Sequence, residues 1–244
     1  MSSSENSEFK QTSAYKQGVT SEDIEEEPEL EPQDLLIWAL EQNKFERFSS
    51  LLEVPEVDPR FKYGKPHYTT CMELACRLKW GGKFVKILLE HGVKPNVQEI
   101  HPQPIHYAAK YGNPEALEAL LKNNNTKINA VDSSGRTALH HAVKYTQRER
   151  DAQYERCIEL LLERPDLALN IKNKSGYTAV HEAANSKKKK AVELILKYRQ
   201  DDVDLDSYST RGRTARECIL SNYPELRKLL PEYRIKNQSL DHHS

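Results

Sequence analysis

The sequence predicts an all-α solenoid built from repeated helix–turn–helix units. A six-residue string recurs with its first residue at positions 70, 103, 137, 178 and 214. The spacings of 33, 34, 41 and 36 residues are typical of repeat proteins, in which stacked units share one continuous core. A pair of aliphatic residues follows each of the first four strings. A polar turn residue, with glycine three positions later, precedes each of the last three strings.

About six units are expected, with β-hairpin or turn connections between them. The first unit, residues 34–66, has apolar segments at 35–40 and 48–52 but lacks the recurrent string. The later units are expected near residues 67–100, 101–134, 135–175, 176–211 and 212–231. The 41-residue spacing reflects about seven extra residues within the charged stretch 145–155, which we expect to lengthen a helix or to form a surface loop. Arg216 replaces the core leucine in the last unit, as expected of a terminal capping unit.

Each recurrent string should begin the first helix of its unit. Thr137 and Thr178 can act as N-caps, because a hydroxyl oxygen can accept a hydrogen bond from a backbone N–H of the first turn, worth ~1 kcal/mol. Leu139 and Ala142 then share one helical face. We expect the small alanine side chains on this face to let neighbouring helices approach closely.

The second helix of the third unit has a clear start. Gly112 suits the left-handed position after the first helix, Asn113 suits the N-cap, and Pro114 suits the first helical position. Apolar residues at 116, 117, 120 and 121 then form a stripe with helical period. The polar residues that precede a glycine by three positions, as in β-turns, are Asp132, Asn173 and Ser209.

Charge is divided unevenly along the chain. Lys and Arg total 36 and Asp and Glu total 37 in 244 residues, so the net charge of -1 gives no reason to expect nucleic-acid binding. Residues 1–34 contain ten acids and two lysines. Because residues 1–33 are also poor in large aliphatics, we expect them to form a disordered acidic tail. Residues 232–244 are expected to be a flexible C-terminal tail or linker.

The sequence indicates neither a membrane span nor a secretory signal. The longest membrane-like run, residues 35–40, is far shorter than the ~20 apolar residues of a spanning helix, and the first residues lack an apolar segment. The four cysteines form no CxxC pair and suit a cytosolic protein with reduced thiols. We interpret them as small buried hydrophobic residues: Cys71, Cys76, Cys157 and Cys218.

The repeats resemble those of the ankyrin repeat family. The strings at 103–108, 137–142 and 178–183 match the family's T-P-L-H-x-A pattern, and residues 88–96 resemble the end of its second helix. This resemblance covers about four-fifths of the chain. It implies a non-enzymatic module that binds protein partners on the concave side of the solenoid. It also implies that His106, His140 and His181 bridge adjacent repeats by hydrogen bonds.

These expectations define two sets of residues. The structural repeat residues are His106, Thr137, His140, Thr178, His181, Gly112, Gly135, Gly176 and Gly212. The partner-binding candidates on the hairpin tips are Ser133, Ser134, Arg136, Lys172, Lys174, Tyr177, Tyr208, Arg211 and Arg213. Those on the first helices are Tyr107, Tyr111, His141 and Tyr145. Tyrosine and arginine are frequent binding hot spots, but we expect fewer than half of these residues to matter.

No catalytic site, metal or cofactor is expected. The stretch 181–185, His-Glu-Ala-Ala-Asn, resembles the zinc motif HExxH but has Asn185 in place of the second histidine ligand. Phosphate-binding loops and the GxSxG nucleophile motif are absent from the sequence. The run of Lys187, Lys188, Lys189 and Lys190 is interpreted as a solvated corner between two helices. The alternatives are nuclear import and a weak contact with anionic lipid.

A narrower resemblance is to the N-terminal cytosolic region of insect TRPA cation channels of the painless type. It is carried by the stretch 145–155, the lysine run, residues 204–208 and residues 224–226. It implies a role in ion transport and in nociceptive or thermal sensing, with neighbouring subunits as partners. The six membrane spans and the pore of such channels are missing from this sequence.

Two functions therefore remain open. The first is the ankyrin region of a painless-like channel, at the cytosolic side of the plasma membrane. The alternative is a free-standing cytoplasmic ankyrin adaptor or inhibitor that binds one protein through its concave groove. Both use the same repeat residues, so the repeats do not separate them.

Overall fold

The computed structural model describes residues 28–64, 69–96, 102–145 and 151–231. The chain divides into two compact parts, the N-terminal part (Met1–Cys71) and the C-terminal part (Met72–Ser244), which are described separately. The expected acidic tail lies largely outside the described residues, and the expected C-terminal tail lies wholly outside them. The stretch 145–155 is described only at residue 145 and from residue 151 onward.

The N-terminal part contains one pair of helices and one pair of short strands. Helix α2 (Pro32–Glu41) begins with proline in its first turn and packs against α3 (Phe45–Leu52). Leu36, Leu40 and Phe48 are fully buried between them. Strands β1 (Lys62–Tyr63) and β2 (Thr69–Thr70) pair antiparallel, with Lys62 opposite Thr70.

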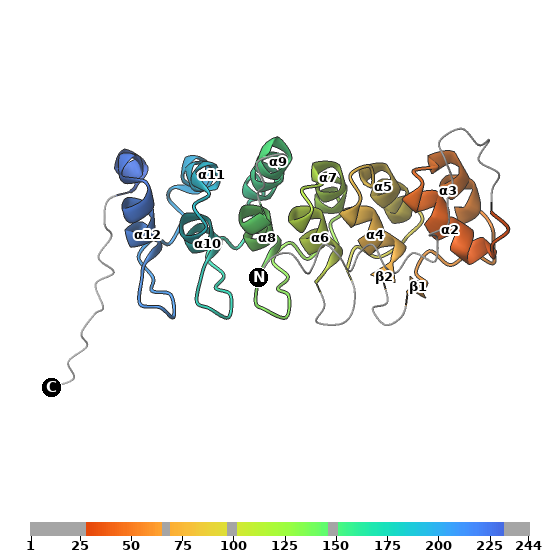
Figure 1. The fold of residues 1–244 in the computed structure, drawn as a ribbon, viewed down its shortest axis with the longest axis horizontal. Coiled ribbons are helices and arrows are strands. Elements are labelled where there is room, and N and C mark those ends of the chain that lie inside the picture. Colours follow the sequence, from red (N-terminus) through yellow and green to blue (C-terminus); the bar gives the residue numbers. More distant parts are fainter. Residues whose placement is uncertain (1–27, 65–68, 97–101, 146–150, 232–244) are drawn as a thin grey trace. The chain divides into compact units, whose positions relative to one another are not determined.

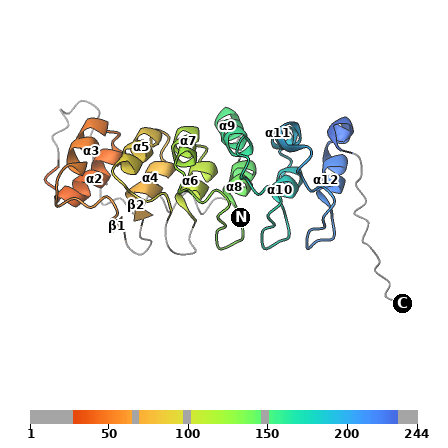
Figure 2. The ribbon, with the colours of Figure 1, turned by 180° about the vertical axis from the view of Figure 1, so that it is seen from behind.

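The C-terminal part consists of helices arranged in two layers (Figures 1 and 2). The first helices form one layer, in which α6 packs against α8, and α8 against α10. The second helices form the other layer, in which α5 packs against α7, and α7 against α9. The first-layer helices are α4 (Cys71–Arg77), α6 (Pro104–Lys110), α8 (Ala138–Tyr145), α10 (Ala179–Asn185) and α12 (Ala215–Asn222). The others are α5 (Gly82–Glu90), α7 (Pro114–Lys122), α9 (Asp151–Leu162), α11 (Lys189–Arg199) and the 3-10 helix η2 (Pro224–Leu229).

Small residues explain how closely the first helices approach one another. Ala108, Ala142 and Ala183 are fully buried on the faces where these helices meet. The aliphatic pairs of the second helices fill the space between the layers, with Leu88, Leu120 and Leu161 fully buried. The predicted all-α solenoid is confirmed, and loops joining successive units extend from the first-helix layer (Figure 1).

The start of α7 has the predicted chemistry. Gly112 follows α6 with φ of 60°, and Pro114 is the first residue of α7. The Asn113 side chain caps the helix by accepting a hydrogen bond from the Ala116 backbone N–H at 3.0 Å. Its amide nitrogen also donates to the Leu78 carbonyl of the preceding unit at 2.7 Å. One residue therefore begins a helix and joins two units.

The threonine hydroxyls contact the first turn, as predicted, and also the histidine ring. The Thr137 hydroxyl oxygen lies 2.9 Å from Nδ1 of His140, but 3.5 Å from the His140 backbone nitrogen that it was expected to cap. In the next unit, the Thr178 hydroxyl lies 2.8 Å from Nδ1 of His181. Because Nδ1 is an acceptor, the hydroxyl donates its proton to the ring and keeps its lone pairs for the backbone N–H. Each hydroxyl therefore orients its histidine as well as capping the first turn.

Arg216 contributes to the last unit in a way that a leucine could not. Its guanidinium binds the Asp206 carboxylate through two nitrogens, at 2.6 and 3.0 Å. The remaining nitrogen donates to the Pro231 carbonyl at 2.9 Å. The residue in the core-leucine position thus fastens the end of the described chain.

Lys187 provides a test of backbone strain. It follows α10 with φ of 56°, the conformation that Gly112 adopts after α6. A residue with a Cβ is strained there by about 1 kcal/mol. We therefore expect Lys187→Gly to raise the free energy of unfolding by about 1 kcal/mol, measured by urea denaturation.

Asn43 is the matched control, because it has φ of 59° but is of a residue type that tolerates the left-handed region. Asn43→Gly should change the stability by much less. A Lys187→Gly protein that is less stable than the parent would contradict the prediction.

Candidate functional site

Three histidines on the first helices bond the hairpins that lead to the next unit. In each ring, Nε2 donates to a backbone carbonyl, so Nε2 carries the proton and Nδ1 is the acceptor. Nε2 of His106 lies 2.9 Å from the Ala130 carbonyl, that of His140 lies 2.9 Å from Tyr177, and that of His181 lies 3.1 Å from Ser207. Nδ1 accepts the backbone N–H at the start of the same helix, from Gln103, Thr137 or Thr178. We call these three residues the histidine ladder.

The ladder requires neutral imidazole rings. Burial lowers the pKa of His106 to about 4 and that of His140 to about 4, and burial also lowers the pKa of His181. A proton on Nδ1 would remove the acceptor that holds the first turn. The histidines are therefore uncharged at neutral pH, and their bonds position the hairpins.

Asparagines form a second ladder that the sequence analysis missed. The Asn129 side chain donates to the Asp166 carbonyl and accepts from the Ala168 N–H, both at 2.8 Å. Asn96 and Asn170 make the same pair of bonds to the unit that follows each of them. The three asparagines are 33 and 41 residues apart, the same spacings as the recurrent strings, so the repeat period could have revealed them. We call them the asparagine ladder.

The ends of the first helices bring together tyrosines and cations. The Arg77 guanidinium lies 4.8 Å from the centre of the Tyr107 ring and 5.7 Å from that of Tyr111. The Lys110 ammonium lies 5.1 Å from the Tyr145 ring centre. Such contacts are worth about 0.5–1 kcal/mol at exposed sites. We call Tyr107, Tyr111 and Tyr145 the tyrosine row; all three are half-buried.

His141, which we expected on the binding surface, is a structural residue instead. Its side chain is 8% exposed, and its Nε2 donates to the Asp132 carboxylate at 2.8 Å. It also stacks on Tyr145, with 5.9 Å between the ring centres. The His141 ring is buried because the turn directs the Asp132 carboxylate toward the helix, where it binds the ring.

Asp132 organises the first hairpin. Burial would raise the pKa of its carboxyl, but hydrogen bonds from His141 and Ser134 outweigh this effect and lower the pKa. One carboxylate oxygen accepts from the backbone N–H groups of Ser134 and Arg136, at 2.8 and 2.9 Å. Arg136 is half-buried and lies 3.8 Å from the Glu182 carboxylate in the next unit. Of the three partner-binding candidates on this tip, only Ser133 is fully exposed.

The two later hairpins expose more of their candidates. Lys172 and Lys174 are exposed on one tip, and Arg211 and Arg213 are exposed on the next. Tyr208 is 62% exposed. Tyr177 is half-buried and stacks on His181, with 6.0 Å between the ring centres.

The glycines expected at the turns lie where the sequence placed them. Gly135, Gly176 and Gly212 all have positive φ, between 69° and 75°. Each closes its turn by donating a backbone hydrogen bond to the polar residue three positions earlier, as in Gly135 N–H to the Asp132 carbonyl at 2.9 Å. The hairpin tips are therefore built alike.

The cysteines are placed for packing. All four are buried as free thiols. Burial raises the pKa of Cys71 to about 12 and that of Cys157 to about 12, and it also raises the pKa of Cys76. A thiol held in this state is a poor nucleophile. Within the described ranges there is no group of three or more His, Cys, Asp or Glu side chains that could hold a metal ion.

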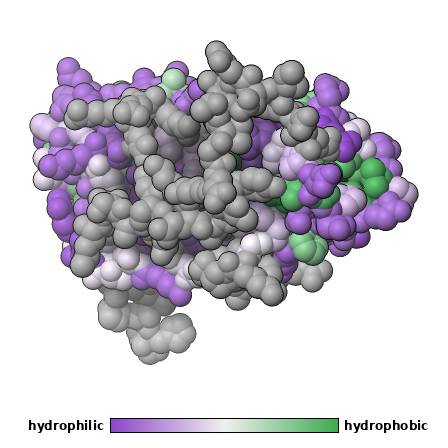
Figure 3. Space-filling model, turned by 45° about the vertical axis from the view of Figure 1, so that its right-hand side comes forward, coloured by the Kyte–Doolittle hydropathy of each residue, from purple (hydrophilic) through white to green (hydrophobic). Residues whose placement is uncertain are grey.

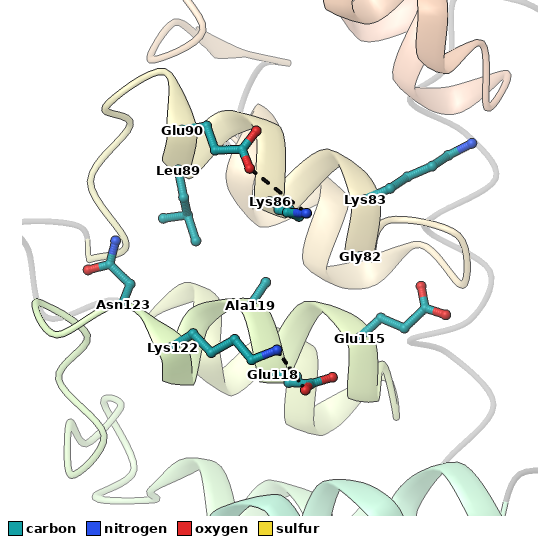
Figure 4. Close-up of a pocket in the computed structure, with 10 residues that line it drawn as sticks. All are labelled: Gly82, Lys83, Lys86, Leu89, Glu90, Glu115, Glu118, Ala119, Lys122 and Asn123. Carbon is teal, nitrogen blue, oxygen red and sulfur yellow. Dashed lines mark ion pairs between the residues drawn. The ribbon is translucent and has the colours of Figure 1, made fainter.

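A shallow groove runs between α5 and α7 in the second-helix layer (Figure 4). Its volume is ≈ 550 Å³, and Leu89 and Ala119 line its floor. Lys122 pairs with Glu118 at 2.9 Å, and Lys86 lies 4.0 Å from Glu90. Each of these pairs lies within a single helix, so neither joins the two sides of the groove.

Hydrophilic residues cover most of the described surface on the face seen in Figure 3. Large hydrophobic side chains that are well exposed are few and scattered among the residues that the structure describes: Phe61, Trp80, Val131, Tyr198, Tyr208 and Leu229. Recognition on this surface would therefore rely on tyrosines and charges rather than on one large apolar patch.

The lysine run forms the corner between α10 and α11. Lys189 lies 2.8 Å from the Glu225 carboxylate of η2 and 3.9 Å from that of Glu193. These pairs reduce the positive charge that the run presents. Contact of this corner with anionic lipid, and nuclear import through it, stay predictions.

No helix among the described residues is long and apolar enough to cross a membrane. A search of curated proteins found no match. A family model described as "Ankyrin repeats (3 copies)" matches residues 74–165, from within α4 to just beyond the end of α9. The chain therefore carries ankyrin repeats and folds as an all-α ankyrin solenoid, a class of protein-interaction module.

Proposed function

We propose that the chain is a non-enzymatic adaptor that binds a protein partner through the tyrosine row and the hairpin tips. The tyrosine row carries this proposal. Three half-buried tyrosines and three cations, Arg77, Lys110 and Lys144, lie together on successive first helices. Their rings already contact cations and other rings, so little side-chain freedom is lost on binding. Tyrosine and arginine are also the side chains most often found at binding hot spots.

A peptide selection on the full chain tests this proposal. Peptides of 12 residues would be selected from a random library, and their Kd measured by fluorescence anisotropy against the parent and two variants. We expect Tyr107→Ala and Tyr145→Ala each to weaken binding about 30-fold, the effect of losing a hot spot. Thermal melting of each variant would show that its fold is kept.

Tyr198→Ala is the matched control. Tyr198 is 36% exposed on α11 in the other layer, and Lys197 lies over its ring as lysines lie over the tyrosine row. Its loss should change Kd by less than twofold. The proposal fails if the library yields no binder, or if the Tyr198 variant weakens binding as much as the tyrosine-row variants do. Should both alanine variants unfold, Lys110→Glu and Lys144→Glu would probe the same surface from half-buried positions.

The resemblance to painless-type channels supplies a second candidate, the cytosolic ankyrin region of a TRPA-like cation channel. It rests on the sequence features at 145–155, the lysine run, 204–208 and 224–226. Transcripts that continue beyond Ser244 into six apolar segments of ~20 residues would support it. Transcripts that all stop at Ser244, with a stable protein of 28.2 kDa in cells, would contradict it.

We place the protein in the cytoplasm under either candidate, on the cytosolic side of the plasma membrane if it belongs to a channel. The four free, buried thiols support a reducing compartment. Imaging of the tagged full chain would test this placement, and a purely secreted protein would contradict it.

A further inference from the structure

The last two hairpins of the described chain form one continuous surface. Thr210 of the second hairpin donates to the Ser175 carbonyl of the first through its backbone N–H at 3.3 Å and its hydroxyl at 2.9 Å. The Lys172 ammonium donates to the Tyr208 carbonyl at 3.0 Å. A Cβ on Gly176 would lie 2.8 Å from the Thr210 nitrogen, so the backbones are in close contact.

Each hairpin is also fixed internally. The Asn173 side-chain oxygen accepts from the backbone N–H groups of Ser175 and Tyr177, at 2.9 and 3.1 Å. Ser209 donates to the Arg213 carbonyl from both its backbone nitrogen and its hydroxyl, each at 2.9 Å. The tips are thus held in place before any partner arrives, which reduces the entropy lost on binding.

This surface carries four exposed cations. Lys172, Lys174, Arg211 and Arg213 are exposed, and none forms an ion pair with a residue that the structure describes. The nearest acids in the sequence make other bonds, and the Glu217 carboxylate accepts from the Thr214 backbone N–H at 3.0 Å. Asp206 binds Arg216, and Asp204 accepts from the backbone N–H groups of Asp206 and Ser207.

The hairpin that Asp132 organises shows that positive charge is not a general property of the hairpin tips. It carries Ser133 and Ser134, and its only cation, Arg136, lies near Glu182. It is built on the same turn but presents no free positive charge at its tip. The cations of the later hairpins are therefore a feature of those two units.

We propose that Lys172, Lys174, Arg211, Arg213 and the exposed Tyr208 form a docking site for an acidic peptide segment of a partner protein. The proposal rests on the proposed function, to which it adds the chemistry of the partner. Carboxylates would pair with the four cations, and Tyr208 would pack against the peptide chain. We infer a short peptide as the occupant because the four cations and Tyr208 lie on only two neighbouring hairpins. A polyanion such as RNA or an anionic membrane would also meet the other charges of a chain whose net charge is -1.

Fluorescence anisotropy on the full chain tests this site. The probe is a fluorescein-labelled peptide of eight glutamates, with an eight-glutamine peptide as the uncharged reference. We expect the glutamate peptide to bind more tightly, and its affinity to fall as salt rises from about 50 to about 300 mM. Lys174→Glu with Arg211→Glu and Arg213→Glu should weaken it at least about tenfold, since three attractive pairs become repulsive.

The matched control reverses three lysines in the second-helix layer, Lys83, Lys86 and Lys197, which are exposed on α5 and α11. It changes the net charge equally, and it should alter the Kd by less than threefold. Equal losses in both triple variants would overturn the proposal, because binding would then depend only on net charge. A melting temperature near that of the parent shows that each variant folds.

Two further probes separate the alternatives. Vesicles of phosphatidylcholine and phosphatidylserine, and a 20-nucleotide poly-U RNA, would be titrated under the same conditions. Binding of either through Lys174, Arg211 and Arg213, without binding of the glutamate peptide, would overturn the acidic-peptide site. Library peptides that bind the tyrosine row, while the glutamate peptide does not bind, would leave the proposed function standing and this inference refuted.

Discussion

The free energy of unfolding should fall steeply as the pH decreases from 6.5 to 4. The histidines of the ladder titrate at 6.5 in the unfolded chain, whereas burial lowers the pKa of His106 and of His140 to about 4 in the fold. The unfolded chain therefore takes up protons first. Their stabilisation is complete above pH 6.5 and is lost as the pH falls to 4. A difference of this size corresponds to about 3 kcal/mol for each histidine, against a total of about 5–15 kcal/mol for a whole domain.

Urea denaturation at intervals between pH 7.5 and 4 would measure this loss. His140→Gln should reduce the slope of stability against pH, because glutamine does not titrate. His91→Gln is the control, since His91 is exposed on the turn after α5. Carboxylates such as Asp132, whose pKa is lowered from 3.8, lose most of their stabilisation below that value, so the loss between pH 6.5 and 4.5 reports the histidines. Constant stability between pH 6.5 and 4.5 would contradict the prediction.

Gly81→Ala should destabilise the C-terminal part by about 3 kcal/mol, near the upper end of overpacking effects. Gly81 is buried where α4 meets α5, and a Cβ there would overlap the Ala75 carbonyl oxygen and lie 2.6 Å from the carbonyl carbon. The obstacle is backbone rather than a flexible side chain. Gly81→Ala can be accommodated only if the two helices separate. Urea denaturation of the variant measures the effect.

Gly92→Ala is the matched control for this substitution. Gly92 has φ of 73°, but no atom lies within 4 Å of the point where a Cβ would stand, so alanine meets only backbone strain of about 1 kcal/mol there. A Gly81→Ala protein as stable as the Gly92→Ala protein would show that α4 and α5 can shift at little cost.

The repeat period accounts for most of what the sequence predicted correctly. It placed the first and second helices and the turns, because each unit buries the same positions against its neighbours. The details of the α7 start followed from local chemistry, since Gly112, Asn113 and Pro114 each suit one position at a helix junction. The same period also passed through Asn96, Asn129 and Asn170, but the bonds they make lie in loops without a hydrophobic pattern.

What could not be predicted depends on contacts across unit boundaries. Arg136 and Glu182 are 46 positions apart, and only the stacking of two units brings them to 3.8 Å. The burial of His141 depends on the direction of the Asp132 carboxylate, which the turn sets. Gly81 immediately precedes α5, and sequence spacing does not reveal that a carbonyl lies against it.

The two ladders have a mechanical consequence. The three asparagines and His140 each bond the next unit along the chain, whereas His106 and His181 bond the start of the hairpin that leads to it. No described bond of either ladder skips a unit. Tension applied along the C-terminal part would therefore act on the boundaries between repeat units one after another. Extension would proceed in steps, one boundary yielding at a time, and a separated pair could reseat without disturbing its neighbours.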